Sequence, residues 1–468
     1  MPTAAQAVWD VTDHGTLTLD SSFWAPKADR RERAGRTARL ADQFLQMNRA
    51  ALAEMGIDPR VAYDGASARL ELRASDMVGG IALRSPTTGM HDLGLVVRPR
   101  FAWRGLGPTW LETGWTVVPT ILGGPQLPQS DRRTPLWVLS SVVLHRLSLM
   151  LRQIDRRFAM QDAVLPAPRG GVRWDQYAAQ HLPRAQFTSV PCRVPVLERD
   201  HDLRGVIHLV LRQQRAALMS VKSDGGIVVT LLEFCNRLLQ SVADTTPRPP
   251  MPGELERWGR SRTLANLRPG LEAIEWTVEE RGLAGLADLR GLPWKLPMNE
   301  FFEAWVERLA RELVVRVGGV LRSGRLRETL SPIQWNPPFT GSQRYLLPDL
   351  VLETEDHTVV LDAKYKRHWR ELSQEPWHSV GEELREEHRR DLLQVLAYSS
   401  LFDARRVSCV LVYPCEESTW DHLEATGQTV QRAEVQGGSR HVDIFLAAIP
   451  FGRRPRDIAG PMIEALVS

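Results

Sequence analysis

The chain has 468 residues, a formal net charge of +3 and four cysteines. Apolar residues make up 43% and charged residues 25% of it, which excludes a disordered or fibrous chain and is typical of a globular protein with two or three domains. No two cysteines have Cys-x-x-Cys spacing, so we expect neither a structural zinc site nor a disulfide framework. The sequence has no P-loop motif, so any step driven by NTP hydrolysis is expected to depend on a partner.

The start of the sequence lacks the basic and then apolar pattern of a signal peptide. No uncharged apolar run reaches the length of about 18 residues that suggests a membrane span. Together with the unpaired cysteines, these features lead us to expect a cytoplasmic protein with no membrane partner.

Residues 1–130 are predicted to form a β-rich domain that docks a partner or DNA. An early helix is expected over 30–52, where the apolar positions include Leu40, Phe44 and Leu45. Short strands are expected at 68–72, 80–83 and 93–97. The Gly-, Pro- and Trp-rich stretches 98–110 and 122–128 are predicted to be loops.

Residues 131–245 are predicted to be mainly helical. One helix is expected over 134–160, with Thr134 as its N-cap and Pro135 at its first position. Its core stripe is expected to be Leu144, Leu147, Leu151, Ile154 and Phe158. Two more helices are expected within 200–245, and residues 246–295 are predicted to be a Pro-rich linker followed by bracing helices.

Residues 296–468 hold the motifs that suggest chemistry. Two β-rich runs, 345–354 and 358–366, flank a polar turn and predict a hairpin. Because alternate residues of a strand share a face, Asp362 and Lys364 should point the same way, and Asp349 should approach from the partner strand. Further strands are expected at 407–413 and 442–449.

Asp349 and Asp362 are candidate metal ligands. Mg²⁺ prefers oxygen ligands and usually takes one or two protein carboxylates, to which the carbonyl of Ala363 could add. Such a metal lowers the pKa of a bound water, and Lys364 could orient that water, act as a base or stabilise charge on the phosphate. The alternative is an ion pair without a chemical role, since Asp-x-Lys is common in strands.

A helix is predicted to begin at Pro297, with Asn299 as an N-cap residue. Glu303 on this helix could reach the same metal. The alternative is an ordinary solvated glutamate.

A second helix is predicted over 389–402. Gln394 and Tyr398 lie four residues apart on one of its faces, and Asp391 lies one turn earlier. The pair could hydrogen-bond to phosphates or to the catalytic groups. The alternative is a helix that only buries its apolar side chains.

A charged insertion is predicted at 366–390, between the second strand of the hairpin and this helix. Basic residues at both of its ends could clamp a DNA backbone, namely Lys366, Arg367, Arg370, Arg389 and Arg390. A solvated loop is the alternative.

These motifs carry a resemblance to known nucleases. Glu303, Pro348-Asp349, Asp362-Ala363-Lys364 and Gln394-x-x-x-Tyr398 resemble the PD-(D/E)xK superfamily, and the last pair is similar to its RecB-like branch. The sequences around these motifs resemble McrC-type nuclease subunits of McrBC-like restriction systems and the related DUF2357 proteins. The similar segments are 297–303, 347–352, 361–366 and 391–398. A weaker likeness extends to 94–101, 169–174 and 192–215.

The resemblance implies an α/β protein whose carboxy-terminal core, residues 296–468, is a mixed central sheet flanked by helices. It implies a deoxyribonuclease that uses Mg²⁺ or Mn²⁺ to hydrolyse phosphodiester bonds of double-stranded DNA. It also implies a complex with a separate McrB-like AAA+ motor NTPase that serves modification-dependent restriction or antiviral defence. Two alternatives stay open: a RecB-like repair nuclease, and an inactive adaptor that activates a motor ATPase.

Overall fold

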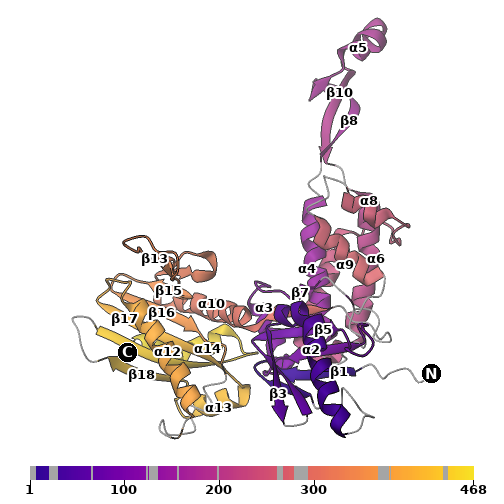
Figure 1. Cartoon of the computed structure of the whole chain (residues 1–468). Coiled ribbons are helices and arrows are strands. Elements are labelled where there is room, and N and C mark those ends of the chain that lie inside the picture. Colours follow the sequence, from indigo (N-terminus) through magenta and orange to yellow (C-terminus); the bar gives the residue numbers. More distant parts are fainter. Residues whose placement is uncertain are drawn as a thin grey trace. The chain divides into compact units, whose positions relative to one another are not determined.

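The structure, a computed structural model, describes residues 7–19, 30–64, 67–122, 125, 135–154, 158–197, 200–260, 267–278, 293–366, 379, 381–435 and 441–467. Within these residues the fold is mixed α/β and contains several sheets (Figure 1). The chain divides into two compact units, one formed by Met1–Asp131 with Arg290–Ser468 and the other by Arg132–Leu289.

The two ends of the chain share one unit because a strand joins them. β11 (Trp294–Pro297) pairs antiparallel with β5 (Met77–Leu83), between the first 130 residues and the segment that begins at 296. The expected division at 130, 245 and 295 therefore differs from the division in space. The described residues of 246–278 belong with the second unit instead of forming a separate bracing segment.

The amino-terminal part of the first unit contains two sheets. The five-stranded sheet has the order β1-β6-β5-β11-β7, with β1 at Ala7–Thr12, β6 at Leu93–Arg98 and β7 at Thr120–Ile121. The three-stranded sheet has the order β2-β4-β3, from Thr16–Leu19, Ser67–Ala74 and Ile57–Asp64. Helix α2 (Arg30–Glu54) packs on β3 and β4 and buries Phe44 against Leu70 and Leu72. The predictions of the early helix and the three strands are confirmed.

The prediction of a loop over 98–110 is wrong, because α3 occupies Trp103–Glu112. Leu106 and Trp110 lie one turn apart and are both buried, and this helical spacing of large apolar side chains outweighs the glycines and Pro108. Of the loop expected at 122–128, Leu122 and Pro125 lie in neither a helix nor a strand, and the remaining residues are outside the described part of the chain.

The second unit combines helices with a small sheet. Its helices are α4 (Leu136–Ile154), α6 (His201–Ser220), α7 (Gly226–Ser241), α8 (Glu254–Arg260) and α9 (Arg268–Val278). The sheet has the order β8-β10-β9, from Phe158–Leu165, Val190–Leu197 and Gly171–Val172, with short turns α5 (Trp174–Gln176), η1 (Tyr177–His181) and η2 (Leu182–Arg184) near one end. Another short turn, η3 (Lys222–Asp224), separates α6 from α7.

The helix expected over 134–160 is confirmed in its middle and wrong at its end. The described helix α4 ends at Ile154, and Phe158 lies in β8, where its backbone pairs with Leu197. The other four residues of the expected stripe are buried. The expected N-cap Thr134 lies outside the described residues.

The carboxy-terminal sheet has the order β12-β15-β16-β17-β19-β18. Its strands are Val320–Ser323, Leu350–Glu353, His357–Ala363, Arg406–Cys415, His441–Pro450 and Val430–Val435 in that order. The pairs β16–β17 and β17–β19 are parallel and the other three are antiparallel, so the sheet is mixed. The predicted hairpin is confirmed as β15–β16, and the two later strands are confirmed as β17 and β19.

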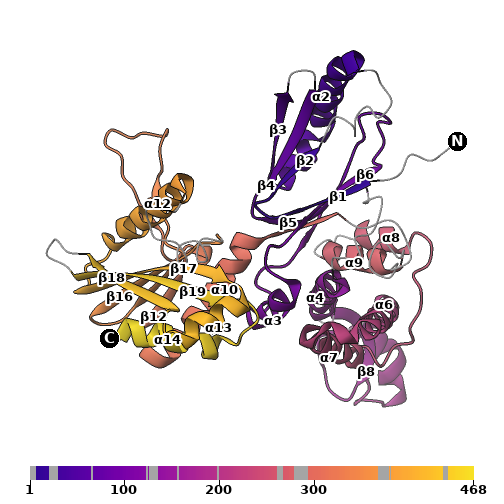
Figure 2. The ribbon, with the colours of Figure 1, turned by 90° about the horizontal axis from the view of Figure 1, so that it is seen from below.

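Helices cover both faces of this sheet. α12 (Glu382–Ser399) contacts β16 and β17 on one face, and α10 (Met298–Val317) and α14 (Pro455–Val467) pack together on the other (Figure 2). α13 (Glu417–Ala425) follows β17. Asn299 lies in the first turn of α10 instead of capping it, because the backbone becomes helical one residue earlier and Pro297 is the N-cap. α12 begins at Glu382, so the predicted insertion 366–390 ends earlier than expected.

All four cysteines are buried and unpaired. None of the helices in the described ranges combines the length and the apolar character that crossing a membrane requires.

Asp443 on β19 is a fully buried carboxylate that holds the sheet's far strands together. It accepts hydrogen bonds from Arg406 Nε at 3.0 Å and Arg432 Nε at 3.2 Å. Burial alone would raise the pKa of Asp443, but the bonds from the two arginines outweigh burial and lower it.

We expect Asp443→Asn to lower the free energy of unfolding by about 2 kcal/mol at neutral pH, because it leaves two arginines without their anion and both are partly exposed. Since the pKa is lowered in the folded state, this loss should shrink as pH falls below the ordinary value of 3.8. Urea denaturation measures it. Asp457→Asn, which removes an exposed carboxylate on α14, is the control and should change little.

Candidate active site

Asp349 and Asp362 face each other across the hairpin. Leu350 pairs with Leu361, so the antiparallel register places Asp349 opposite Asp362. Oδ2 of Asp349 accepts a hydrogen bond from the Ala363 N–H at 2.8 Å. The backbone N–H of Gly324 also donates to the Asp349 carbonyl at 2.7 Å. A Cβ on Gly324 would lie 2.5 Å from the Pro348 carbonyl oxygen, so glycine is required for this close approach.

The two carboxylates are in surroundings that disfavour negative charge. Burial raises the pKa of Asp349 well above its ordinary value, and the Asp362 and Glu303 carboxylates raise it further. Burial also raises the pKa of Asp362, although the Lys364 ammonium opposes that shift. A divalent cation between the two aspartates would offset this repulsion, and two carboxylates match what Mg²⁺ usually takes from a protein.

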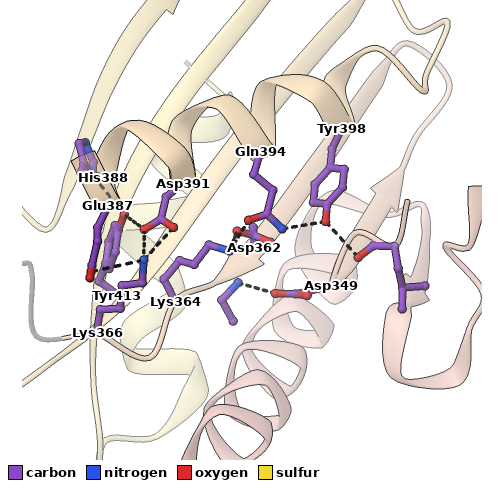
Figure 3. A network of polar contacts seen from close by, with 12 residues as sticks. Asp349, Asp362, Lys364, Lys366, Glu387, His388, Asp391, Gln394, Tyr398 and Tyr413 are labelled. Carbon is purple, nitrogen blue, oxygen red and sulfur yellow. Dashed lines mark hydrogen bonds and ion pairs between the residues drawn. The ribbon is translucent and has the colours of Figure 1, made fainter. Parts of the chain in front are cut away.

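Lys364 completes the group. Its Nζ lies 2.6 Å from Oδ2 of Asp362 and donates a hydrogen bond to Gln394 Oε1 at 2.9 Å (Figure 3). Burial alone would lower the pKa of Lys364, but the surrounding carboxylates, Asp362 first, raise it. The Lys364 side chain therefore stays positively charged, and its contacts with Asp362 and Gln394 fix its position.

Gln394 and Tyr398 link helix α12 to the loop that carries Asp349. The Gln394 Nε2 amide donates to the Tyr398 hydroxyl at 2.9 Å, and that hydroxyl donates to the Leu347 carbonyl at 3.4 Å (Figure 3). Because the Gln394 amide nitrogen donates to Tyr398, the Gln394 amide oxygen points towards Lys364.

We expect Gln394→Ala to lower the rate of the chemical step about 10- to 100-fold, as the loss of a partner that orients an active-site group does elsewhere. Tyr398→Phe should cost less, because the Gln394 oxygen still accepts from Lys364. Single-turnover kinetics with saturating substrate measure the rate. Equal losses in the two variants would contradict this order, and Leu393→Ala, an exposed position on the same helix, is the control.

Glu303 lies on helix α10, near Asp349 and Asp362. Burial raises its pKa, and Asp362 and Lys364 are among the charges that act on it. Within the described residues, however, no three Asp, Glu, His or Cys side chains converge as a metal cluster. Glu303 is thus placed to act on the charge of the site, and its role as a ligand stays a prediction, as does that of the Ala363 carbonyl.

The basic residues expected to clamp DNA are mostly paired. Lys366 Nζ donates to both carboxylate oxygens of Asp391, at 2.9 and 3.0 Å, and Arg389 and Arg390 lie beside Glu386. Arg367 and Arg370 lie outside the described residues. Asp391 also accepts from the Tyr413 hydroxyl at 3.2 Å, so Asp391 ties α12 to β17.

Tyr365, the residue after Lys364, makes a contact that the sequence did not suggest. Its hydroxyl donates to Asp13 Oδ2 at 2.7 Å, and its carbonyl accepts from Arg100 Nη2 at 3.0 Å. The Arg100 guanidinium carbon lies 4.6 Å from the Tyr365 ring centroid. Asp13 and Arg100 are distant from Tyr365 in sequence, and no spacing pattern links them to it, so only the fold brings them to the end of β16.

Fold and site together define a mixed α/β protein with a carboxylate–lysine site, the donor set that suits metal-assisted hydrolysis. The chain belongs to the McrBC 5-methylcytosine restriction system component family, whose model matches residues 136–414. The predicted resemblance to McrC-type subunits of such systems is thereby confirmed. No curated protein matches the chain.

Two solved structures from Thermococcus gammatolerans are similar to this chain. One is a half-complex of McrB AAA+ hexamers with bound McrC, which is 16% identical over 98% of this chain and 100% of that chain, with a TM-score of 0.40. The other is the McrBC complex, which is 16% identical over 66% of this chain and 88% of that chain, with a TM-score of 0.26.

Proposed function

We propose that this restriction system component is the subunit that cuts DNA, a metal-dependent endonuclease with a PD-(D/E)xK core. The observation that carries the proposal is the meeting of Asp349, Asp362 and Lys364 at one end of β16. Membership of the McrBC family supports it, since the family description names a restriction system.

Asp349 and Asp362 would hold the metal, Mg²⁺ or Mn²⁺. When bound, the ion polarises the scissile phosphate and lowers the pKa of a water molecule. Lys364, kept charged by its neighbours, orients the attacking water and stabilises negative charge on the phosphate, and its raised pKa argues against the role of general base. Gln394 fixes the position of Lys364, and Glu303 adjusts the charge of the pair of aspartates.

We further propose that the chain works with a McrB-like AAA+ NTPase in antiviral defence. The chain has no P-loop of its own. One structure similar to it contains McrB AAA+ hexamers with bound McrC, which makes such a motor the partner to try first. Double-stranded DNA carrying 5-methylcytosine is the corresponding substrate to test, given the family description.

The test is a plasmid cleavage assay with this chain, its AAA+ partner, NTP and Mg²⁺. Cleavage of the circular plasmid should require both proteins. It should stop when EDTA is added and resume when Mg²⁺ or Mn²⁺ is added in excess. Cleavage that persists in Lys364→Ala would contradict the assignment. Degradation of linear, unmodified DNA without the motor would favour a repair nuclease, and stimulated NTP hydrolysis without cutting would favour an inactive adaptor.

A further inference from the structure

A small hairpin stands next to the candidate active site and is not explained by it. It consists of β13 (Ser331–Pro332), β14 (Tyr345–Leu346) and the connection between them, and we call it the 331–346 hairpin. Figure 1 shows it at the β13 label, projecting beyond the strands β15 and β16. Its side chains from Asn336 to Tyr345 are exposed.

Both ends of the hairpin are fastened to the loop that carries Asp349. On the outgoing side, Thr329 Oγ1 donates to the Pro348 carbonyl at 2.6 Å. On the returning side, β14 runs through Leu347 directly into Pro348 and Asp349, and Tyr398 donates to Leu347. The hairpin is therefore positioned by the same contacts that position the metal-binding aspartate.

The connection has internal order although it is exposed. Trp335 Nε1 donates to the Gln343 carbonyl at 2.9 Å, and Ile333 N–H donates to the Arg344 carbonyl at 2.7 Å. The Phe339 ring lies edge-on to Trp335, with centroids 6.0 Å apart, and folds over Gly341. Trp335 is 42% and Phe339 56% exposed, so two large aromatic rings are presented to solvent in a defined arrangement.

The charge of the hairpin suits a polyanion. No aspartate or glutamate occurs from Thr329 to Pro348. Arg344 on the hairpin and Arg327 at its base are exposed, and neither has an acidic partner among the residues that the structure describes. Arg389 and Arg390 on α12 are different, because the Glu386 carboxylate already lies beside both of them.

We propose that the 331–346 hairpin binds the DNA duplex beside the scissile phosphate, with Arg344 and Arg327 on the phosphate backbone and Trp335 and Phe339 against the bases. This inference rests on the proposed function, since DNA is the substrate of the same site. The major groove of B-DNA admits a two-stranded ribbon, and exposed aromatic side chains stack on bases or wedge between them. Exposed arginines with no carboxylate in the hairpin suit the phosphate backbone of a nucleic acid, because cationic side chains bind it by neutralising phosphates.

The first experiment maps what the hairpin touches. p-Benzoylphenylalanine replaces Phe339 in the full chain carrying Asp362→Asn, and the complex with the AAA+ partner is irradiated on a labelled duplex containing 5-methylcytosine. We expect a crosslink to DNA. The same photo-crosslinker at Val315, an exposed position near the end of α10, is the matched control and should give none. A crosslink from position 339 to protein only, or no crosslink, overturns the proposal.

The second experiment measures the contribution of the hairpin in the cutting-competent complex. Trp335→Ala with Phe339→Ala should raise the KM for the duplex about tenfold, within the range expected for losing an aromatic contact to a base, and change kcat little. Arg344→Ala should raise KM and also reduce its dependence on salt. Unchanged KM in both variants, with circular dichroism showing that they are folded, overturns the proposal.

The two proposals fail differently. If the wild-type complex cuts DNA, Asp362→Asn does not, and the hairpin variants behave as wild type, the hairpin inference is wrong and the nuclease assignment stands. If the crosslink to DNA forms but no complex cuts DNA, the nuclease assignment is wrong and the hairpin is a DNA-binding element.

Discussion

Asp362→Asn should abolish DNA cleavage without destabilising the protein. Asp362 is 1% exposed and is one of the two aspartates proposed to hold the metal, so its loss should lower the single-turnover rate at least about a thousandfold, equivalent to the several kcal/mol of transition-state stabilisation that a metal supplies. Asparagine keeps the shape of the side chain but not its charge.

Stability separates a catalytic role of Asp362 from a structural one. Burial raises the pKa of Asp362, so folding costs more free energy when this carboxylate is ionised than when it is neutral. The free energy of unfolding of Asp362→Asn should therefore match or exceed that of the metal-free wild type at pH 7. Because a raised pKa makes the wild type more stable as pH falls towards the ordinary value of 3.8, the advantage of the variant should disappear in acid.

Metal binding supplies a second measurement that does not depend on cutting. A ligand that binds only the folded protein raises Tm, so Mg²⁺ should raise the Tm of the wild type and leave that of Asp362→Asn unchanged. Glu355→Gln removes an exposed carboxylate from the turn of the same hairpin and is the matched control. Cleavage by Asp362→Asn, or an equal Mg²⁺ effect on both proteins, would show that Asp362 does not hold the metal.

The parts of the site that could be predicted from sequence are those with local periodicity. Asp362 and Lys364 share a strand face because they are two residues apart, and Gln394 and Tyr398 share a helix face because they are four apart. Asp349 was predictable because a hairpin reverses the chain next to it. In each case the residue spacing fixes the direction of the side chain before any tertiary contact forms.

Other features of the fold depend on tertiary contacts and could not be predicted from local spacing. Leu106 and Trp110 are buried together, which keeps α3 helical through a Gly- and Pro-rich stretch, and strand pairing takes Phe158 out of the preceding helix. The prediction that Arg389 and Arg390 could clamp DNA overlooked a local pattern. Glu386 lies three and four residues before Arg389 and Arg390, so the sequence already contained the carboxylate that pairs with them.

Arg100→Ala should lower both the stability of the protein and its rate of cutting. Arg100 is 10% exposed and its Nε lies 3.4 Å from Oδ2 of Asp13, whose side chain is fully buried. Removing one partner of such a pair leaves a buried charge uncompensated and costs about 3–5 kcal/mol. The change also removes the hydrogen bond to the Tyr365 carbonyl, one residue after Lys364, so the ammonium should lose part of its fixed position.

The pH dependence of this loss identifies its electrostatic part. Burial raises the pKa of Asp13, and Arg100 opposes that shift, so removing Arg100 should raise the pKa further. A raised pKa in the folded state makes stability fall as pH rises, so the variant should lose most at neutral pH. The difference from wild type should shrink as pH approaches the ordinary value of 3.8. Burial and the positive charge of Arg100 lower the pKa of His14 to about 4. In acid, His14 becomes charged and is repelled by Arg100 in the wild type but not in the variant. This also makes the stability difference between the two proteins smaller at low pH.

Urea denaturation at several pH values and single-turnover cleavage at pH 7 measure the two effects. Arg60→Ala is the matched control, since Arg60 and its partner Asp58 are 66% and 57% exposed and such a pair contributes under about 1 kcal/mol. Arg100→Lys should recover part of the stability, because it keeps the charge, but less of the cutting rate, because lysine cannot reproduce the planar contact with the Tyr365 ring. Full recovery of both by lysine would show that charge alone matters, and a stability loss independent of pH would show that the Asp13 carboxylate is not what Arg100 compensates.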